Sequence, residues 1–82
     1  MSGHANQHSA SVLIGLNLAA ARKRKGFKQR EVAAELGVSE RMVTRWEKGQ
    51  HRPSALYEKR LVALLLDGDL GALYAEPAKQ VA

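Results

Sequence analysis

Residues 29–49, QREVAAELGVSERMVTRWEKG, decide the fold of this chain. They contain two helix-forming segments joined by a short turn centred on Gly37, with the small residue Ala33 four positions before that glycine. Two helices that cross at roughly 90–120° over so short a turn approach closely, so a bulky residue at position 33 would force them apart. Gly37 supplies the positive φ angle that such a turn needs. The stretch therefore predicts two helices, 29–36 and 39–48, packed at a steep angle.

Three more helices are predicted outside this stretch, one before it and two after it, and each follows a residue suited to capping a helix. They are 12–25 after Ser11, 55–66 after Ser54 and 70–75 after Asp69. Along the four longer segments, apolar residues recur at the spacing of one helix face and predict the core: Ile14, Leu18, Ala21, Val32, Ala33, Leu36, Val43, Trp46, Tyr57, Leu61, Leu64 and Leu65. The sequence therefore predicts an all-α fold, a compact bundle of about five short helices.

The length and composition fit one small domain. A chain of 82 residues, of which 45% are hydrophobic, lies within the roughly 50–200 residues of a single core. The first eleven residues are small and polar. We therefore expect a mobile polar tail over residues 1–11, one domain over 12–76 and a frayed end over 77–82.

The positive charge is concentrated in the middle of the chain. Residues 22–52 contain ten Lys and Arg against four Glu, a net charge of +6, whereas residues 53–82 carry −1 and residues 1–21 have no Lys, Arg, Asp or Glu. A basic middle between neutral and slightly acidic ends is typical of a protein that binds a polyanion such as nucleic acid. A solvated charged face is the plainer alternative, and charge alone leaves it open.

Several classes of function are disfavoured by what the sequence lacks. Without cysteine there is no disulfide framework, thiol nucleophile or Cys-ligated metal site, and no apolar run approaches the roughly 18 residues that span a bilayer. His4 and His8 have a spacing that could hold a metal on a helix, but no third ligand accompanies them. We therefore expect a cytoplasmic protein that is not an enzyme and uses no cofactor, metal, membrane or small-molecule ligand.

Segment 39–48 has one apolar and one polar face. Val43 and Trp46 point inward and anchor the helix, while the opposite face is polar and rich in Arg. A helix of this length with such a face can lie in the major groove of DNA and contact the edges of the bases. The segment is therefore the candidate for sequence recognition.

Features of the turn, the core and the helix ends occur together in one register. They comprise Arg22…Lys25-Gly26, Gln29…Val32-Ala33…Leu36-Gly37-Val38-Ser39 and Val43…Arg45-Trp46-Glu47-Lys48-Gly49…Pro53-Ser54. With these features, residues 14–66 resemble the Cro/CI-type (XRE) helix-turn-helix domain of phage and bacterial repressors. The resemblance implies a sequence-specific transcriptional regulator that binds double-stranded DNA, with repression as the expected outcome. It further implies a bacterial or phage protein of the cytoplasm, associated with the nucleoid.

The resemblance also implies roles for particular residues. The positions that match base readout are Ser39, Glu40, Arg41, Thr44 and Arg45, and those that match phosphate contacts are Lys28, Gln29, Lys48, Gln50, His51 and Arg52. Arg22 and Glu47 match a family salt bridge that orients the recognition helix. Lys28 departs from the family pattern, because Ser, Thr or Asn usually stands there, and its presence removes a helix cap worth about 1 kcal/mol.

A homodimer is expected, assembled either in solution or only on DNA, because one such domain buries only about 600–1,000 Å² on DNA. Two copies would read a near-palindromic operator. Leu66, Leu70, Leu73 and Tyr74 either form the dimer contact or complete the core of the monomer. The rival function is a protein-interaction module on the same fold, of the antitoxin or coactivator type. That function predicts an apolar outer face on segment 39–48, where the sequence instead places Arg.

Overall fold

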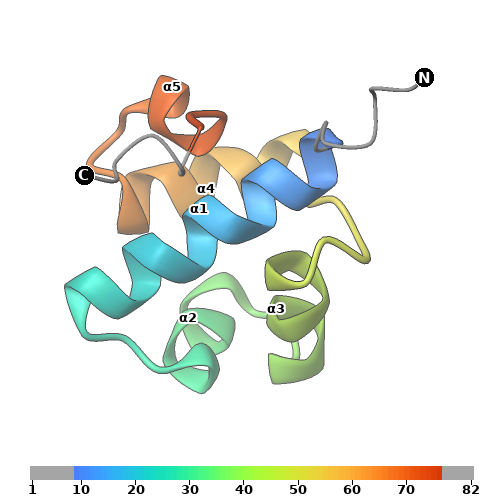
Figure 1. The fold of residues 1–82 in the computed structure, drawn as a ribbon. Coiled ribbons are helices and arrows are strands. Elements are labelled where there is room, and N and C mark those ends of the chain that lie inside the picture. Colours follow the sequence, from blue (N-terminus) through green and yellow to red (C-terminus); the bar gives the residue numbers. More distant parts are fainter. Residues whose placement is uncertain (1–8, 77–82) are drawn as a thin grey trace.

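The computed structural model describes residues 9–76, which form five helices around one core (Figure 1). In chain order they are α1 (Ala10–Lys25), α2 (Gln29–Leu36), α3 (Glu40–Glu47), α4 (Ala55–Leu65) and α5 (Leu70–Leu73). This part of the chain contains no strand, so the predicted all-α bundle is confirmed. Residues 1–8 and 77–82, which include His4, His8, most of the predicted tail and the whole predicted frayed end, lie outside the described residues.

The first helix begins two residues earlier than predicted. Ser9 is the N-cap, and its Oγ accepts a hydrogen bond from the Val12 N–H at 3.2 Å. The prediction of a helix that starts at Val12 after a Ser11 cap was therefore wrong. Both serines suit a cap, and in the structure the Ser9 hydroxyl caps the helix, so Ser11 lies within the first turn.

The corner between α2 and α3 has the predicted geometry. Gly37 adopts φ +73°, and the Val38 N–H donates to the Ala33 carbonyl at 3.0 Å, which ends α2 with a left-handed residue. Ala33 is buried between the helices, and Ser39 caps α3 by accepting from the Met42 N–H at 3.1 Å. The turn between the two helices thus combines one left-handed glycine, one small buried residue and one capping hydroxyl.

The core contains most of the predicted residues and three more. The buried hydrophobic residues of the core are Ile14, Leu18, Ala21, Val32, Ala33, Leu36, Val43, Trp46, Leu61, Val62, Leu65, Leu66 and Leu73. Tyr57 and Leu64 are half-buried, and the Tyr57 ring lies 5.5 Å from that of Trp46. Leu66 and Leu73 therefore belong to the core of the monomer, whereas Leu70 and Tyr74 remain exposed at 52% and 37%.

Helix α1 is the centre of the bundle, with α2 and α3 on one side and α5 on the other (Figure 1). Its closest approach to α3 is at Gly15, where an added Cβ would lie 2.4 Å from the Trp46 carbonyl oxygen and 2.6 Å from that of Glu47. On the opposite side, the Asn17 side chain donates to the carbonyls of Leu73 and Ala75, both at 2.8 Å. These contacts fix the end of α3 and the end of α5 to the same helix.

Candidate nucleic-acid interface

Helix α3 has the two faces that the sequence predicted. Val43 and Trp46 are each 2% exposed and hold the helix against the core. Glu40, Arg41 and Arg45 are exposed on the other side. Within residues 9–76 neither arginine forms an ion pair, so both guanidinium groups are available to a ligand. Arg41 and Arg45 lie four residues apart and so share one face of the helix.

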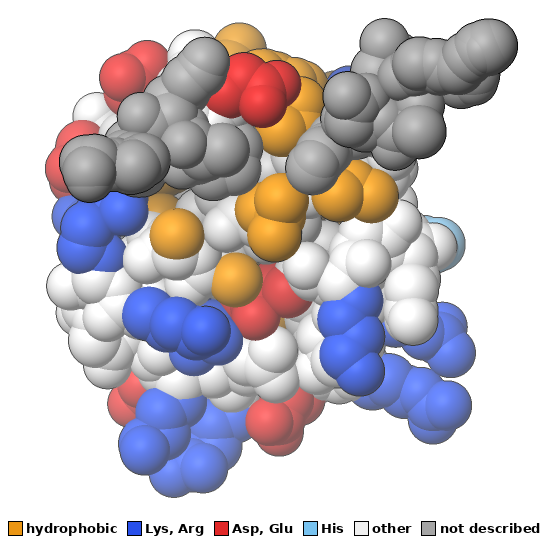
Figure 2. All heavy atoms as spheres, in the orientation of Figure 1, with side chains coloured by type: hydrophobic (Ala, Val, Ile, Leu, Met, Phe, Trp, Pro, Cys, Tyr) orange, Lys and Arg blue, Asp and Glu red, His pale blue; other side chains and the backbone are white. Residues whose placement is uncertain are grey.

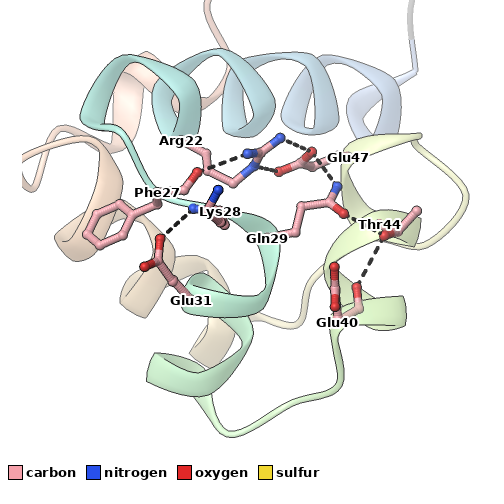
Figure 3. Close-up of polar contacts among 8 residues, drawn as sticks. All are labelled: Arg22, Phe27, Lys28, Gln29, Glu31, Glu40, Thr44 and Glu47. Atoms are coloured by element: carbon pink, nitrogen blue, oxygen red, sulfur yellow. Dashed lines mark hydrogen bonds and ion pairs between the residues drawn. The ribbon is translucent and has the colours of Figure 1, made fainter.

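An ion pair ties α3 to α1 (Figure 3). Arg22 Nε donates to Glu47 Oε2 at 2.6 Å, and Arg22 Nη2 donates to Glu47 Oε1 at 3.1 Å. The third guanidinium nitrogen donates to the Phe27 carbonyl at 3.0 Å. The hydrogen bond to Glu47 raises the pKa of Arg22 above its ordinary value, so the guanidinium keeps its charge. The ion pair that the family resemblance implies is thus present.

Gln29 extends this ion pair to Thr44 on α3 (Figure 3). Its Nε2 donates to Glu47 Oε1 at 2.9 Å, and its Oε1 accepts from the Thr44 hydroxyl at 2.9 Å. The sequence suggested Gln29 for phosphate contact and Thr44 for base readout, but not their contact with each other. The pairing joins the first residue of α2 to the fifth residue of α3, and no local pattern in the sequence indicates it.

The N-terminus of α2 is stabilised in a way the sequence analysis missed. Lys28 is the N-cap residue and makes no side-chain cap, as expected, but the Glu31 carboxylate accepts from the Lys28 N–H at 2.7 Å. This is one half of a capping box, and the signal for it is a Glu three positions after the cap. The Lys28 side chain is left exposed beside the start of α2, where the helix dipole favours an anion.

The remaining candidates for phosphate contact follow α3. Lys48, Gln50, His51 and Arg52 are all exposed in the segment between α3 and α4. Arg52 differs from the other three because its guanidinium donates to the Tyr74 hydroxyl at 3.2 Å and lies 3.5 Å from Glu58 Oε2. Arg52 therefore has to exchange these partners before it can contact a phosphate.

The surface charge is unevenly distributed. Lys and Arg side chains gather over the lower part of the face in Figure 2, where α2 and α3 lie, and hydrophobic side chains lie above them over α1. Residues 9–76 contain no group of three or more His, Asp or Glu that could hold a metal ion. No helix in the described part is long and apolar enough to cross a membrane. The basic surface over α2 and α3 is therefore suited to binding an anion.

The comparison with protein families agrees with this geometry. Residues 18–65 match a helix-turn-helix family of the XRE, Cro/CI type, which is more than half of the chain. The chain therefore belongs to this family of DNA-binding regulators. Comparisons with curated proteins and with solved structures gave no match.

Proposed function

We propose that this protein is a sequence-specific transcriptional repressor that inserts α3 into the major groove of double-stranded DNA. The observation that carries the proposal is the exposure of Arg41 and Arg45 on the face of α3 opposite the buried Val43 and Trp46. An arginine in the major groove forms two hydrogen bonds with guanine O6 and N7, and Glu40 has the oxygens to accept from cytosine N4. Occupying a promoter site suffices for repression and requires only such a binding face.

The phosphate contacts come from both sides of α3. One side is the start of α2, where Lys28 is exposed and one Nε2 hydrogen of Gln29 remains unused after the bond to Glu47. The other side is the segment after α3, which holds Lys48, Gln50, His51 and Arg52. These contacts add affinity without sequence information, and each one makes binding weaker as the salt concentration rises.

A matched set of arginine variants tests the proposal. Arg45→Ala is expected to cost about 1–3 kcal/mol on the preferred sequence and to relax the preference at one position. Arg52→Ala is expected to weaken binding to preferred and random DNA about equally, because the DNA contact that it removes goes to a phosphate and carries no sequence information. Arg60→Ala, which removes an exposed arginine from α4, is the control for net charge. Equal losses on both DNAs for Arg45→Ala and Arg52→Ala would refute this division of roles.

We further propose that the DNA-bound form is a homodimer on a near-palindromic site in a bacterial or phage genome, so that the protein acts in the cytoplasm. Two copies spaced by one helical turn, about 34–36 Å, would double the small contact of a single domain. Leu70 and Tyr74 are the candidates for the dimer contact, since both are exposed on the surface of α5 and the turn after it. Sedimentation at micromolar concentration, with and without duplex DNA, separates a dimer in solution from one that forms only on DNA.

The alternative is a protein-interaction module of the antitoxin or coactivator type. Leu56 on α4 is 58% exposed and is the observation that favours it. A protein partner would give an affinity that hardly changes with salt, whereas a DNA contact with several phosphates gives a log Kd that changes linearly with log salt concentration. The salt titration therefore separates the two functions.

A further inference from the structure

A chain of hydrogen bonds with only one possible direction ends at Thr44. Both Glu47 oxygens accept from the Arg22 guanidinium, so the group of Gln29 that faces Glu47 Oε1 is the amide NH2. The amide oxygen of Gln29 then faces Thr44, and the Thr44 hydroxyl has to donate to it. Among residues 9–76, the only other acceptor for this proton is the Glu40 carbonyl at 3.2 Å. The ion pair between Arg22 and Glu47 thus fixes the direction of every bond up to Thr44.

As a consequence, the Thr44 hydroxyl hydrogen is not available to donate to a base. A threonine hydroxyl has one hydrogen and two lone pairs, so Thr44 can present to DNA only its methyl group and an oxygen that accepts. Adenine N6 and cytosine N4 donate in the major groove, and thymine carries a methyl group, but the guanine edge offers only the acceptors N7 and O6. An oxygen that cannot donate gains nothing from guanine and is repelled by it.

We infer that Thr44 is a specificity-determining residue that rejects guanine at the base it faces, and that Gln29 is the positioning residue that imposes this choice. The inference rests on the proposed DNA-binding function and makes it more specific. Two exposed arginines favour guanine at their own positions, so the same helix would select for guanine at some positions and against it at another. Thr44 is half-buried beside α2, which keeps its hydroxyl within reach of Gln29.

The test is selection of bound sequences from a random duplex pool by the full chain and its variants. Thr44→Ala identifies the position read by Thr44 as the one whose base preference changes. At that position we expect the wild type to bind guanine about fivefold or more weakly than the preferred base, the lower end of what one wrong base pair costs. Gln29→Met removes both amide groups at nearly constant length and leaves the Thr44 hydroxyl only the longer bond to the Glu40 carbonyl, which a guanine acceptor can replace. The variant is therefore expected to recover most of the binding to guanine at this position alone.

Two controls separate this effect from a general loss of affinity. Gln50→Met makes the same change at an exposed glutamine that makes no bond to Thr44, and it should weaken binding evenly while leaving the base preference intact. The double variant Gln29→Met with Thr44→Val has no hydroxyl to donate, so its gain of guanine binding should be clearly smaller than that of Gln29→Met. Thermal unfolding of each variant checks that the fold is retained.

The outcomes distinguish failure of the inference from failure of the proposed function. A wild type that enriches no sequence at all contradicts the proposed function. A wild type that enriches a site but accepts guanine at the Thr44 position overturns the inference. The same holds if Thr44→Ala changes no position, if Gln29→Met leaves guanine rejected, or if the double variant gains guanine as Gln29→Met does.

Discussion

The substitution Gly15→Ala tests how closely α1 and α3 are packed. In the interior of a helix, alanine is normally more stable than glycine by about 0.5–1 kcal/mol, because glycine loses more backbone freedom on folding. At position 15 the added methyl carbon would lie 2.4 Å from the Trp46 carbonyl oxygen and 2.6 Å from that of Glu47. Both oxygens belong to the backbone of α3 and cannot turn away as a side chain could. The Trp46 carbonyl also accepts from the Gly49 N–H at 3.1 Å, so a shift of α3 disturbs its own end.

Gly15→Ala is therefore expected to lower the free energy of unfolding, although helix propensity alone would raise it. Excess volume in a packed contact costs about 1–3 kcal/mol, and after the gain from alanine the net loss is about 1–2 kcal/mol. For a domain of this size that corresponds to a fall in Tm of about 5–15 °C, measured by circular dichroism on heating. Gly71→Ala is the control, because its Cβ would meet only Asp69 Oδ1 at an ordinary 3.4 Å. A Gly15→Ala protein as stable as the wild type would refute the close packing.

Three other substitutions test separate parts of the structure. Glu47→Gln is expected to reduce the free energy of unfolding by about 1–3 kcal/mol, since Arg22 loses its charged partner in a largely buried site; urea unfolding measures this, and an unchanged midpoint would contradict it. The Lys25 ammonium holds the pKa of Asp67 below its usual 3.8, so this pair contributes stability above that pH and loses it as the pH falls through the lowered pKa. The stability difference between wild type and Asp67→Asn should accordingly shrink below about pH 4, and a difference constant down to about pH 2 would contradict the pairing. Leu73→Ala is expected to cost about 2–5 kcal/mol at every protein concentration, because this side chain is fully buried within one monomer; a loss that depends on concentration would place it in a dimer contact instead.

The sequence predicts the parts of the fold that depend on local chemistry. Gly37 has to adopt a left-handed conformation, Ser39 has to cap the next helix, and Val43 and Trp46 have to face inward, and the structure agrees with each. The end of α2 and the buried face of α3 follow from residues within a few positions of one another. Such features are set by the backbone and by helical spacing, and need no knowledge of distant neighbours.

The parts that the sequence did not predict depend on distant contacts. Ser9 and Ser11 are equivalent as caps by residue type, and only the structure shows that Ser9 is the one used. The requirement for glycine at position 15 arises only where α1 crosses α3, since its sequence neighbours predict an ordinary helix. Leu66 and Leu73 could have served a dimer or a core, and only the packing of the helices against one another shows that both are buried. The bond between Gln29 and Thr44 likewise joins two elements that the sequence treats separately.

The central claim is that the exposed face of α3 reads guanine in the major groove. The most direct measurement is the affinity for the selected duplex after each guanine in turn is replaced by 7-deazaguanine, which lacks the N7 acceptor of the major groove. For the wild type we predict weaker binding when one or two particular guanines are replaced. For Arg41→Ala or Arg45→Ala, replacing the corresponding guanine should weaken binding no further. Affinity that is unchanged by every such replacement in the wild type would contradict the claim.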